Sequence, residues 1–251
     1  LPGPGSDWWT QAVAAWWADH FRRKLEPGHR WTLLDVIDGN LSLPRRVFDA
    51  VGRFDEGFRG GRRQDHELGV RLLAQGIPLV AEPRAFGWHD FDTRLETGLR
   101  NASEEGLYDV RIARMHPAVV HQLPLGGVRV DELASGARPR TATTLARLRA
   151  LERADLRRAW ADASAGAMRR AYVAGVREAL GGEAAAALAA LLAAAPPPEP
   201  VEVRLDGVGS FRAAVPPGRQ WDVDGMVDLL LESNPSAVGL PSALRRPRAE
   251  R

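Results

Sequence analysis

The stretch with the most chemistry in it runs from Gly52 to Gly76 and reads GRFDEGFRGGRRQDHELGVRLLAQG. Around its double glycine it gathers Asp55, Glu56, Asp65, His66 and Glu67. A carboxylate at a helix start can cap the free backbone N–H groups. Kept ionised by the positive helix end, it can also accept a proton from a substrate as a general base. Both roles are compatible at Asp65, where we expect a helix to begin.

Three further patterns contain residues that could ligate a metal or form an ion pair. His89, in AFGWHDF, either packs beside its aromatic neighbours Trp88 and Phe91 or ligates a metal. Paired aspartates can hold Mg²⁺ or Mn²⁺ through oxygen ligands, but three residues are too short a pattern to assign a site. The two such pairs are Asp90 with Asp92 and Asp222 with Asp224. Glu67 and Arg71, four residues apart, predict an ion pair on a helix surface.

Helices and strands must position these residues. Apolar spacing predicts helices over 8–25, 43–51, 65–75 and 95–115, and short strands over 31–37, 77–81 and 85–89. Asp7 is the expected cap of the first helix and Ser42 that of the second. The paired tryptophans at 8, 9, 16 and 17 favour core packing over a membrane-surface helix or a sugar platform.

The amino-acid composition of the chain changes near Leu123. Residues 124–141 read as a linker, and residues 142–195 as two helices divided at Gly181 and Gly182. After the proline-rich break APPPEP, alternating apolar residues around Asp206-Gly207 predict a hairpin. We therefore expect three segments, at 1–125, 126–195 and 196–251, the last a small α+β or partly disordered tail.

The composition of the chain argues against several kinds of partner and site. The net charge is only +2, and arginines between 147 and 158 alternate with acids, so a nucleic-acid partner is not expected. The chain has no cysteine, which excludes disulfides, thiolate zinc sites and cysteine nucleophiles. No apolar run reaches about 18 residues, and no signal peptide is recognised at the beginning. A cytoplasmic protein, or one peripheral to the inner membrane, is the expectation.

Read together, residues 38–91 resemble the second half of the catalytic domain of family-two inverting glycosyltransferases of the bacterial type. The family pattern is Gly-Asn-x-Ser, an Arg-x-x-Phe helix, Gly-Gly-Phe-Asp-Glu, a glycine-rich loop, Glu-Asp-x-Glu-Leu-Gly-x-Arg-Leu, and a later histidine. The residues that match it here are Gly39, Asn40, Ser42, Arg45 or Arg46, Phe48, Gly52, Phe54, Asp55, Glu56, Asp65, Glu67, Leu68, Gly69, Arg71, Leu72 and His89. The resemblance covers roughly residues 7–125.

The resemblance implies a GT-A (nucleotide-diphospho-sugar transferase) fold, which is α/β, followed here by a helical segment and the small α+β tail. It implies that Asp65 is the catalytic base, which takes the proton of an acceptor hydroxyl as that oxygen attacks the anomeric carbon with inversion. It also implies a substrate-binding set of Asn40, Ser42, Phe54, Asp55, Glu56, Gln64 and Glu67. His89 would complete a Mn²⁺ or Mg²⁺ site on the nucleotide diphosphate.

The implied partners are a nucleotide-sugar donor and a hydroxyl acceptor on a glycan, a lipid carrier or another molecule. Two residues depart from the pattern: Gln64 stands where the family usually has Glu, and Arg53 replaces the second glycine before Phe54. The family's nucleotide-binding half would lie upstream of residue 1, so this chain alone is expected to bind nucleotide sugars weakly. The rival hypothesis is a non-catalytic transferase module that acts as a binding or interaction domain.

Overall fold

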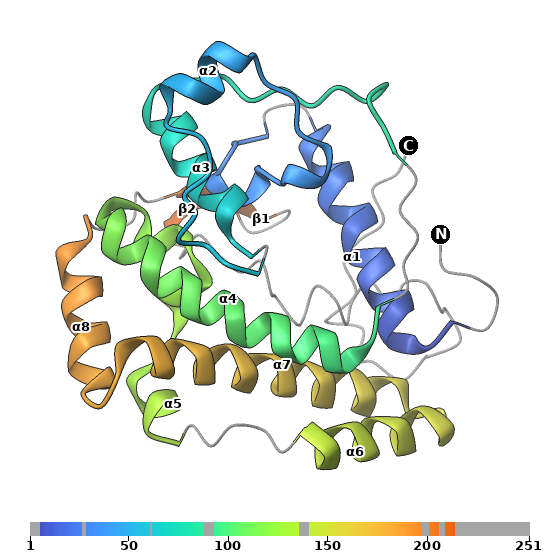
Figure 1. Cartoon of the computed structure of the whole chain (residues 1–251). Coiled ribbons are helices and arrows are strands. Elements are labelled where there is room, and N and C mark those ends of the chain that lie inside the picture. The colour runs from blue at the N-terminus through green and yellow to red at the C-terminus, as the bar shows by residue number, and fades with distance from the viewer. Residues whose placement is uncertain are drawn as a thin grey trace.

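The computed structural model describes residues 6–26, 29–60, 62–87, 93–135, 141–196, 201–205 and 209–213, and helices dominate it (Figure 1). The α-helices are α1 Trp8–Lys24, α2 Arg45–Ala50, α3 Gln64–Ala74, α4 Leu95–Met115, α5 Val130–Ser135, α6 Thr141–Arg153, α7 Arg157–Leu180 and α8 Ala184–Ala194. The 3₁₀ turns are η1 Leu33–Asp35, η2 Asp38–Asn40, η3 Pro117–Gln122 and η4 Pro124–Gly127.

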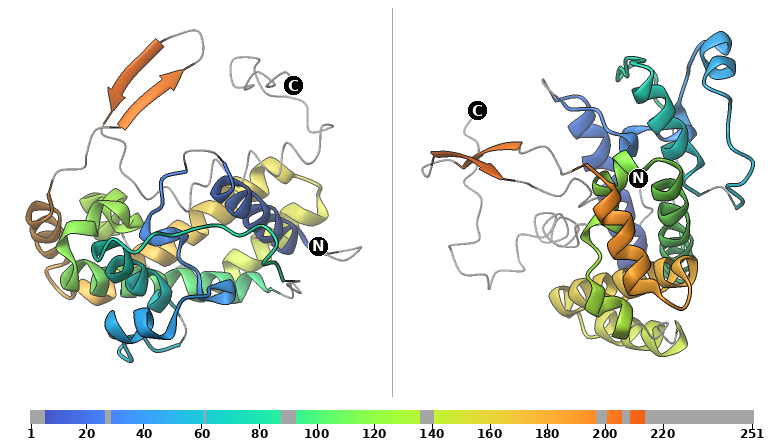
Figure 2. Two further views of the ribbon diagram at one scale, coloured as in Figure 1. Left: turned by 90° about the horizontal axis from the view of Figure 1, so that it is seen from above. Right: turned by 90° about the vertical axis from the view of Figure 1, so that its left-hand side faces the viewer.

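The α/β expectation is wrong for the described part of the chain. Its only sheet there is an antiparallel hairpin of β1 Val201–Leu205 and β2 Gly209–Ala213, in which Val203 lies opposite Phe211. The hairpin predicted from alternating apolar residues in the tail is thus confirmed. Figure 2 shows it standing apart from the helices. The turn between its strands lies outside the described residues.

The strands expected over 31–37, 77–81 and 85–89 are not formed in the described residues. Residues 33–35 make the turn η1, which a capping box closes: Asp35 accepts from the backbone N–H of Thr32 at 2.8 Å. Residues 77–82 run extended beside no strand that the structure describes. A strand needs a partner for its backbone hydrogen bonds, so apolar, β-branched composition alone was not sufficient.

α1 confirms the prediction for its residues. The Asp7 carboxylate caps it by accepting from Thr10 N at 2.8 Å. Trp8 and Trp9 are buried, and Trp8 packs edge-on against Trp160 of α7 at a centroid distance of 5.7 Å. Core packing is therefore the role of these two tryptophans, while Trp16 and Trp17 remain half-buried.

The centre of the molecule is the pair α4 and α7, which run side by side (Figure 1). Glycines let the two backbones touch. A Cβ atom on Gly106 of α4 would lie 2.2 Å from the carbonyl oxygen of Tyr172, and one on Gly175 of α7 would lie 1.8 Å from that of Ser103. Real Cβ atoms do not come so close, so glycine is required at both positions for this approach.

One apolar core surrounds this pair and includes buried residues from Trp8 in α1 to Leu188 in α8. A smaller cluster of Val36, Val51, Leu68 and Leu72 lies under α2 and α3. Leu68 and Leu72 of this cluster belong to α3, so the apolar spacing from which this helix was predicted corresponds to a buried face. The division into segments at 125 and 195 stays a prediction, but the larger core includes residues on both sides of position 125.

Three local expectations about secondary structure are wrong. The stretch expected to be a linker forms η4 and α5 and buries Leu125 and Leu133, because apolar side chains recur in it at helical spacing. The helical stretch after it breaks twice: at Gly181, as predicted, and at Asp155, whose φ is 52°. Ser42 caps no helix, since Pro44 holds the N-cap position of α2.

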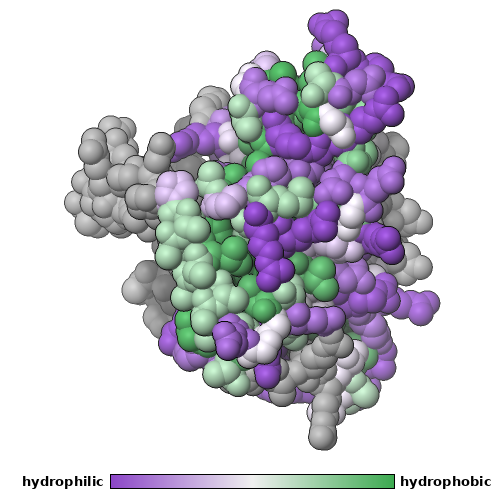
Figure 3. Space-filling model, turned by 60° about the vertical axis from the view of Figure 1, so that its left-hand side comes forward, coloured by the Kyte–Doolittle hydropathy of each residue, from purple (hydrophilic) through white to green (hydrophobic). Residues whose placement is uncertain are grey.

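α8 lies at the edge of the bundle with Leu188 fully buried. Its exposed positions after the N-cap are all alanine: Ala185, Ala186, Ala189, Ala190, Ala193 and Ala194. Figure 3 brings forward the side of the molecule on which Figure 1 shows α8, and apolar residues form a continuous area on that face. Alanine has the highest helix propensity, which explains why so uniform a sequence is helical.

Candidate active site

The N-cap residue of α3 has an unusual backbone conformation. Arg63 occupies the N-cap position with φ 64°, in the left-handed region, which costs a side-chain-bearing residue about 1–2 kcal/mol. Its guanidinium is buried and forms an ion pair with Asp109 of α4, Nε to Oδ1 at 2.9 Å. Glu105 lies 3.5 Å from the same guanidinium. The buried charges thus fix the backbone from which α3 begins.

Asp65 lies in the first turn of α3 and does not cap it, so the capping prediction is wrong. The helix starts one residue earlier than expected, which moves the N-cap position to Arg63. The Asp65 side chain is 13 % exposed. Its Oδ1 accepts from the backbone N–H of His66 at 2.8 Å, and its Oδ2 lies 3.4 Å from the backbone nitrogen of Asp38.

Asp38 brings a second carboxylate to the same place. It belongs to η2, and its Oδ2 accepts a hydrogen bond of 2.7 Å from Nε2 of Gln64. Burial raises the pKa of Asp65, the His66 hydrogen bond opposes this, and the negative charge of Asp38 raises the pKa further. A carboxylate whose pKa lies above its ordinary value is a stronger base than an exposed aspartate.

Basic side chains lie near the first turn of α3. Burial lowers the pKa of His66 well below its usual value, and its Nδ1 lies 2.9 Å from the Arg63 guanidinium. Burial, with the charge of Lys24, lowers the pKa of His20 to about 4. Burial also lowers the pKa of Lys24 to about 8, although Asp35 and Asp65 raise it. Both histidines are therefore neutral at pH 7, and Lys24 keeps most of its charge.

Asp55, Phe54 and Glu56 form a separate loop before α3. Asp55 accepts from Gly57 N at 2.8 Å and pairs with Arg111 of α4 at 2.9 Å, and the Arg111 interaction lowers its pKa. Phe54 is 39 % exposed and packs edge-on against Phe48. Glu56 is exposed. Asp55 thus ties the loop to α4, while Phe54 and Glu56 face solvent.

Glu67 points inward. Its side chain is 1 % exposed and pairs with Arg71 at 2.6 Å and with Nε2 of His116 at 2.9 Å. Arg71 also donates to the carbonyl oxygens of Val51 and Arg53, so the pair fastens the end of α2 to α3. The ion pair is confirmed, but its predicted place on the helix surface is wrong because the loop after α2 covers it.

The remaining candidate residues are Asn40, Ser42, His89 and the paired aspartates. Asn40 follows Asp38 in η2, and its Nδ2 donates to the carbonyl oxygen of Ala85 at 2.7 Å. Ser42 is exposed. His89 lies outside the described residues, as do the aspartates at 90, 92, 222 and 224. Gln64 and Asp65, adjacent in sequence, both contact Asp38, whereas the loop residues and Glu67 make their contacts elsewhere.

Four residues that the sequence did not single out shape this site: Asp38, Lys24, Arg63 and Asp109. Asp38 directly precedes the Gly39-Asn40 pair of the matched pattern, which was a usable signal. Arg63 and Asp109 are 46 residues apart, and no local spacing connects them.

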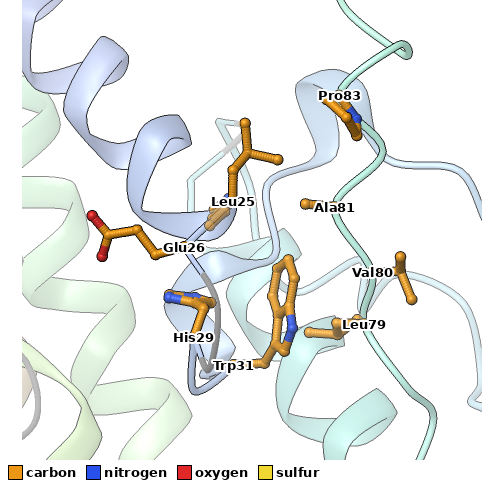
Figure 4. A pocket seen from close by; sticks show the side chains of 9 residues that line it. Leu25, Glu26, His29, Trp31, Leu79, Val80, Ala81 and Pro83 are labelled. Atoms are coloured by element: carbon orange, nitrogen blue, oxygen red, sulfur yellow. The ribbon is translucent and has the colours of Figure 1, made fainter. Parts of the chain in front are cut away.

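A pocket of about 430 Å³ opens between the end of α1 and the extended segment after α3 (Figure 4). It is lined by Lys24, Leu25, Glu26, His29, Trp31, Leu79, Val80, Ala81 and Pro83. In Figure 4 the Trp31 indole points toward Leu79 and Ala81, and Glu26 points away from it. Asp65 does not line this pocket, but the charge of Asp65 acts on Lys24, which does.

No three histidine, aspartate or glutamate side chains within the described ranges lie where they could hold a metal ion together. The metal site that the resemblance implies rests on His89, which lies outside the described residues, so this site stays a prediction. In the described part of the chain, none of the helices combines the length and the apolar character needed to cross a bilayer.

Sequence comparison finds a partial similarity to two glucosyltransferases. The chain is 39% identical over 93 residues to validoxylamine A glucosyltransferase of Streptomyces hygroscopicus subsp. jinggangensis (strain 5008), which is 37% of this chain and 20% of that protein. The enzyme of the same name from subsp. limoneus matches over the same length with 39% identity, which is 19% of its chain. The match thus spans about a fifth of these relatives. No family model and no solved structure matches.

Proposed function

We propose that this chain is part of an inverting glycosyltransferase in which Asp65 is the general base. The observation that carries the proposal is the placement of Asp65: a mostly buried carboxylate in the first turn of α3, beside Asp38 and with a raised pKa. The similarity to glucosyltransferases supports the reaction class.

The chemistry follows from this placement. The acceptor hydroxyl oxygen forms a bond to the anomeric carbon of the donor sugar, while the bond from that carbon to the nucleotide diphosphate breaks. The hydroxyl proton passes to Asp65, whose raised pKa strengthens it as an acceptor. Nε2 of Gln64, the residue before the proposed base, donates a hydrogen bond to Asp38. Glucose is the first sugar to consider, since the relatives are named as glucosyltransferases.

A divalent cation, Mn²⁺ or Mg²⁺, remains part of the proposal through His89. When bound, such an ion stabilises the charge that develops on the leaving diphosphate. The proposed partners are a nucleotide sugar and a hydroxyl acceptor on a glycan, a lipid carrier or a similar molecule.

The test is the substitution Asp65→Asn in the intact protein. Glucosyl transfer from UDP-, GDP- and ADP-glucose to validoxylamine A would be followed by mass spectrometry. We expect transfer to fall by about 10²–10⁴-fold, the usual contribution of a positioned base, while the folded state persists because Asn can still accept from His66 N. Asp131→Asn, an exposed aspartate in α5 paired with Arg129, is the matched control.

Gln64→Ala should weaken acceptor binding more than turnover, since it removes a neighbour of the base and keeps the base itself. Near-normal transfer by Asp65→Asn would contradict the assignment of the base. A protein that transfers none of these sugars, yet binds a carbohydrate, would favour the binding-module hypothesis.

A further inference from the structure

A buried polar chain joins the candidate base to α7, far along the sequence. The Tyr172 hydroxyl of α7 donates to Oδ2 of Asp109 at 2.6 Å. Asp109 is fully buried in α4 and pairs through Oδ1 with the Arg63 guanidinium. Arg63 immediately precedes α3, whose first turn carries Asp65. Three helices thus contribute to one connected set of side chains.

The chain is well suited to hold a fixed geometry. An unpaired buried charge is costly, so Arg63 and Asp109 each need the other. Oδ2 of Asp109 accepts from the Tyr172 hydroxyl at 2.6 Å and from Nη2 of Arg63 at 3.5 Å, whereas Oδ1 and the Arg63 Nε form an ion pair without a hydrogen bond. Burial and the charge of Asp109 raise the pKa of Tyr172 well above its usual value, so this hydroxyl keeps its proton and continues to donate.

The chain reaches Asp65 through the backbone of Arg63. The Arg63 carbonyl oxygen accepts from Glu67 N at 3.0 Å, the first helical bond of α3. At φ 64°, Arg63 sets the direction in which the helix starts, and this conformation needs support from its surroundings. The orientation of the Asp65 carboxylate therefore depends on where the Arg63 side chain is held.

α7 can reach this position because of the glycine contacts. Gly106 lies under the Tyr172 carbonyl, and Gly175 lies under that of Ser103. The close crossing brings Tyr172 to Asp109, one turn beyond Gly106 on α4. Residues of α7 lie beyond the stretch that resembles known transferases, so nothing in that resemblance indicates this role.

We propose that Tyr172 and Asp109 are positioning residues for Asp65 and act on it through Arg63. This inference rests on the proposed function for its catalytic meaning. Its structural content, that α7 sets the environment of the Asp65 carboxyl, can be measured without any substrate.

The experiment compares Tyr172→Phe with the unchanged protein and with Ser164→Ala. Phenylalanine keeps the ring and removes only the donor. Ser164 is a buried hydroxyl on the same helix whose partner is Ala161 O, outside the chain of contacts. The Asp65 carboxyl would be titrated by ¹³C NMR in protein labelled at aspartate, and its signal assigned with Asp65→Asn.

We expect the Asp65 titration midpoint to move down toward that of an exposed aspartate in Tyr172→Phe, because a looser first turn admits water to the carboxyl. Ser164→Ala should leave the midpoint unchanged. Where transfer is measurable, kcat should fall about 10- to 100-fold at an unchanged KM for UDP-glucose, as for a misplaced catalytic group. Arg63→Lys, which keeps the charge but loses the planar fork, should act in the same direction.

Coincident titration curves for Tyr172→Phe and the unchanged protein would overturn the inference, whatever the activity. A shifted midpoint together with near-normal transfer by Asp65→Asn would support the positioning and refute the proposed function. A shifted midpoint in both Tyr172→Phe and Ser164→Ala would assign the effect to α7 packing in general and would also overturn it.

Discussion

At the scale of single residues, the site is defined by two carboxylates in different surroundings. Asp65 is mostly buried, and Asp38 is exposed and accepts from Gln64. Such differences in environment separate the roles of paired acids in many enzymes, since the less hydrated group is the one whose pKa rises. In the proposed mechanism Asp65 is therefore the proton acceptor, and the charge of Asp38 raises its pKa.

This arrangement predicts the pH dependence of the reaction. A general base must be ionised, so transfer should fall as the pH drops through the raised pKa of Asp65. Asp38→Asn removes a neighbouring negative charge and makes ionisation of Asp65 easier. The acid limb of the kcat profile should then move to lower pH, while Asn still accepts the Gln64 hydrogen bond.

The profile would be measured with glucosyl donors between about pH 4 and 8, a range that contains ordinary and raised carboxyl pKa values. Asp131→Asn again serves as the control for a lost surface charge. An acid limb that stays in place in Asp38→Asn, or moves to higher pH, would refute the electrostatic coupling of the two carboxylates.

At the scale of elements, the crossing of α4 and α7 determines the position of the site. The obstacles at this crossing are backbone carbonyl oxygens, which cannot turn away as a flexible side chain can. Gly175→Ala should therefore force the helices apart and lower the free energy of unfolding by about 1–3 kcal/mol, the usual cost of overpacking.

Gly166→Ala on the same helix is the matched control for this prediction. A Cβ there would meet only the end of the Arg170 side chain, at 3.1 Å, which can move. Alanine should be neutral or stabilise by up to about 1 kcal/mol through its helix propensity. Urea unfolding of both variants would be compared. Equal stability of the two would mean that the crossing tolerates a methyl group.

The elements also show what the sequence could predict. The limits of α4, the cap of α1 and the stop of α7 at Gly181 depend on neighbouring residues, and all were correct. The strand predictions failed because a strand depends on a partner strand, which can be distant in the chain. The residues of the candidate site divide in the same way: Asp65 lies in a local sequence pattern, whereas Arg63, Asp109 and Tyr172 meet only after folding.

At the scale of the whole molecule, the sequence resemblance ends near residue 125, but the core does not. Trp8 of α1 packs on Trp160 of α7, and Val110 and Ala113 of α4 are fully buried in the same cluster. The part that carries the candidate base and the helices after it are therefore stabilised by shared contacts. A segment boundary in sequence need not be a boundary in stability.

Truncation tests this directly. A chain of residues 1–125 loses α7, so it would expose the buried face of α4 and leave Arg63 and Asp109 without the Tyr172 hydroxyl. We expect it to show no cooperative unfolding transition and weak near-ultraviolet circular dichroism, because it lacks a closed core. A chain of residues 1–196 keeps every member of the described core and is the control, which we expect to unfold at the same temperature as the full chain. Cooperative unfolding of residues 1–125 would show that the first segment is a domain by itself and that α7 is an accessory to it.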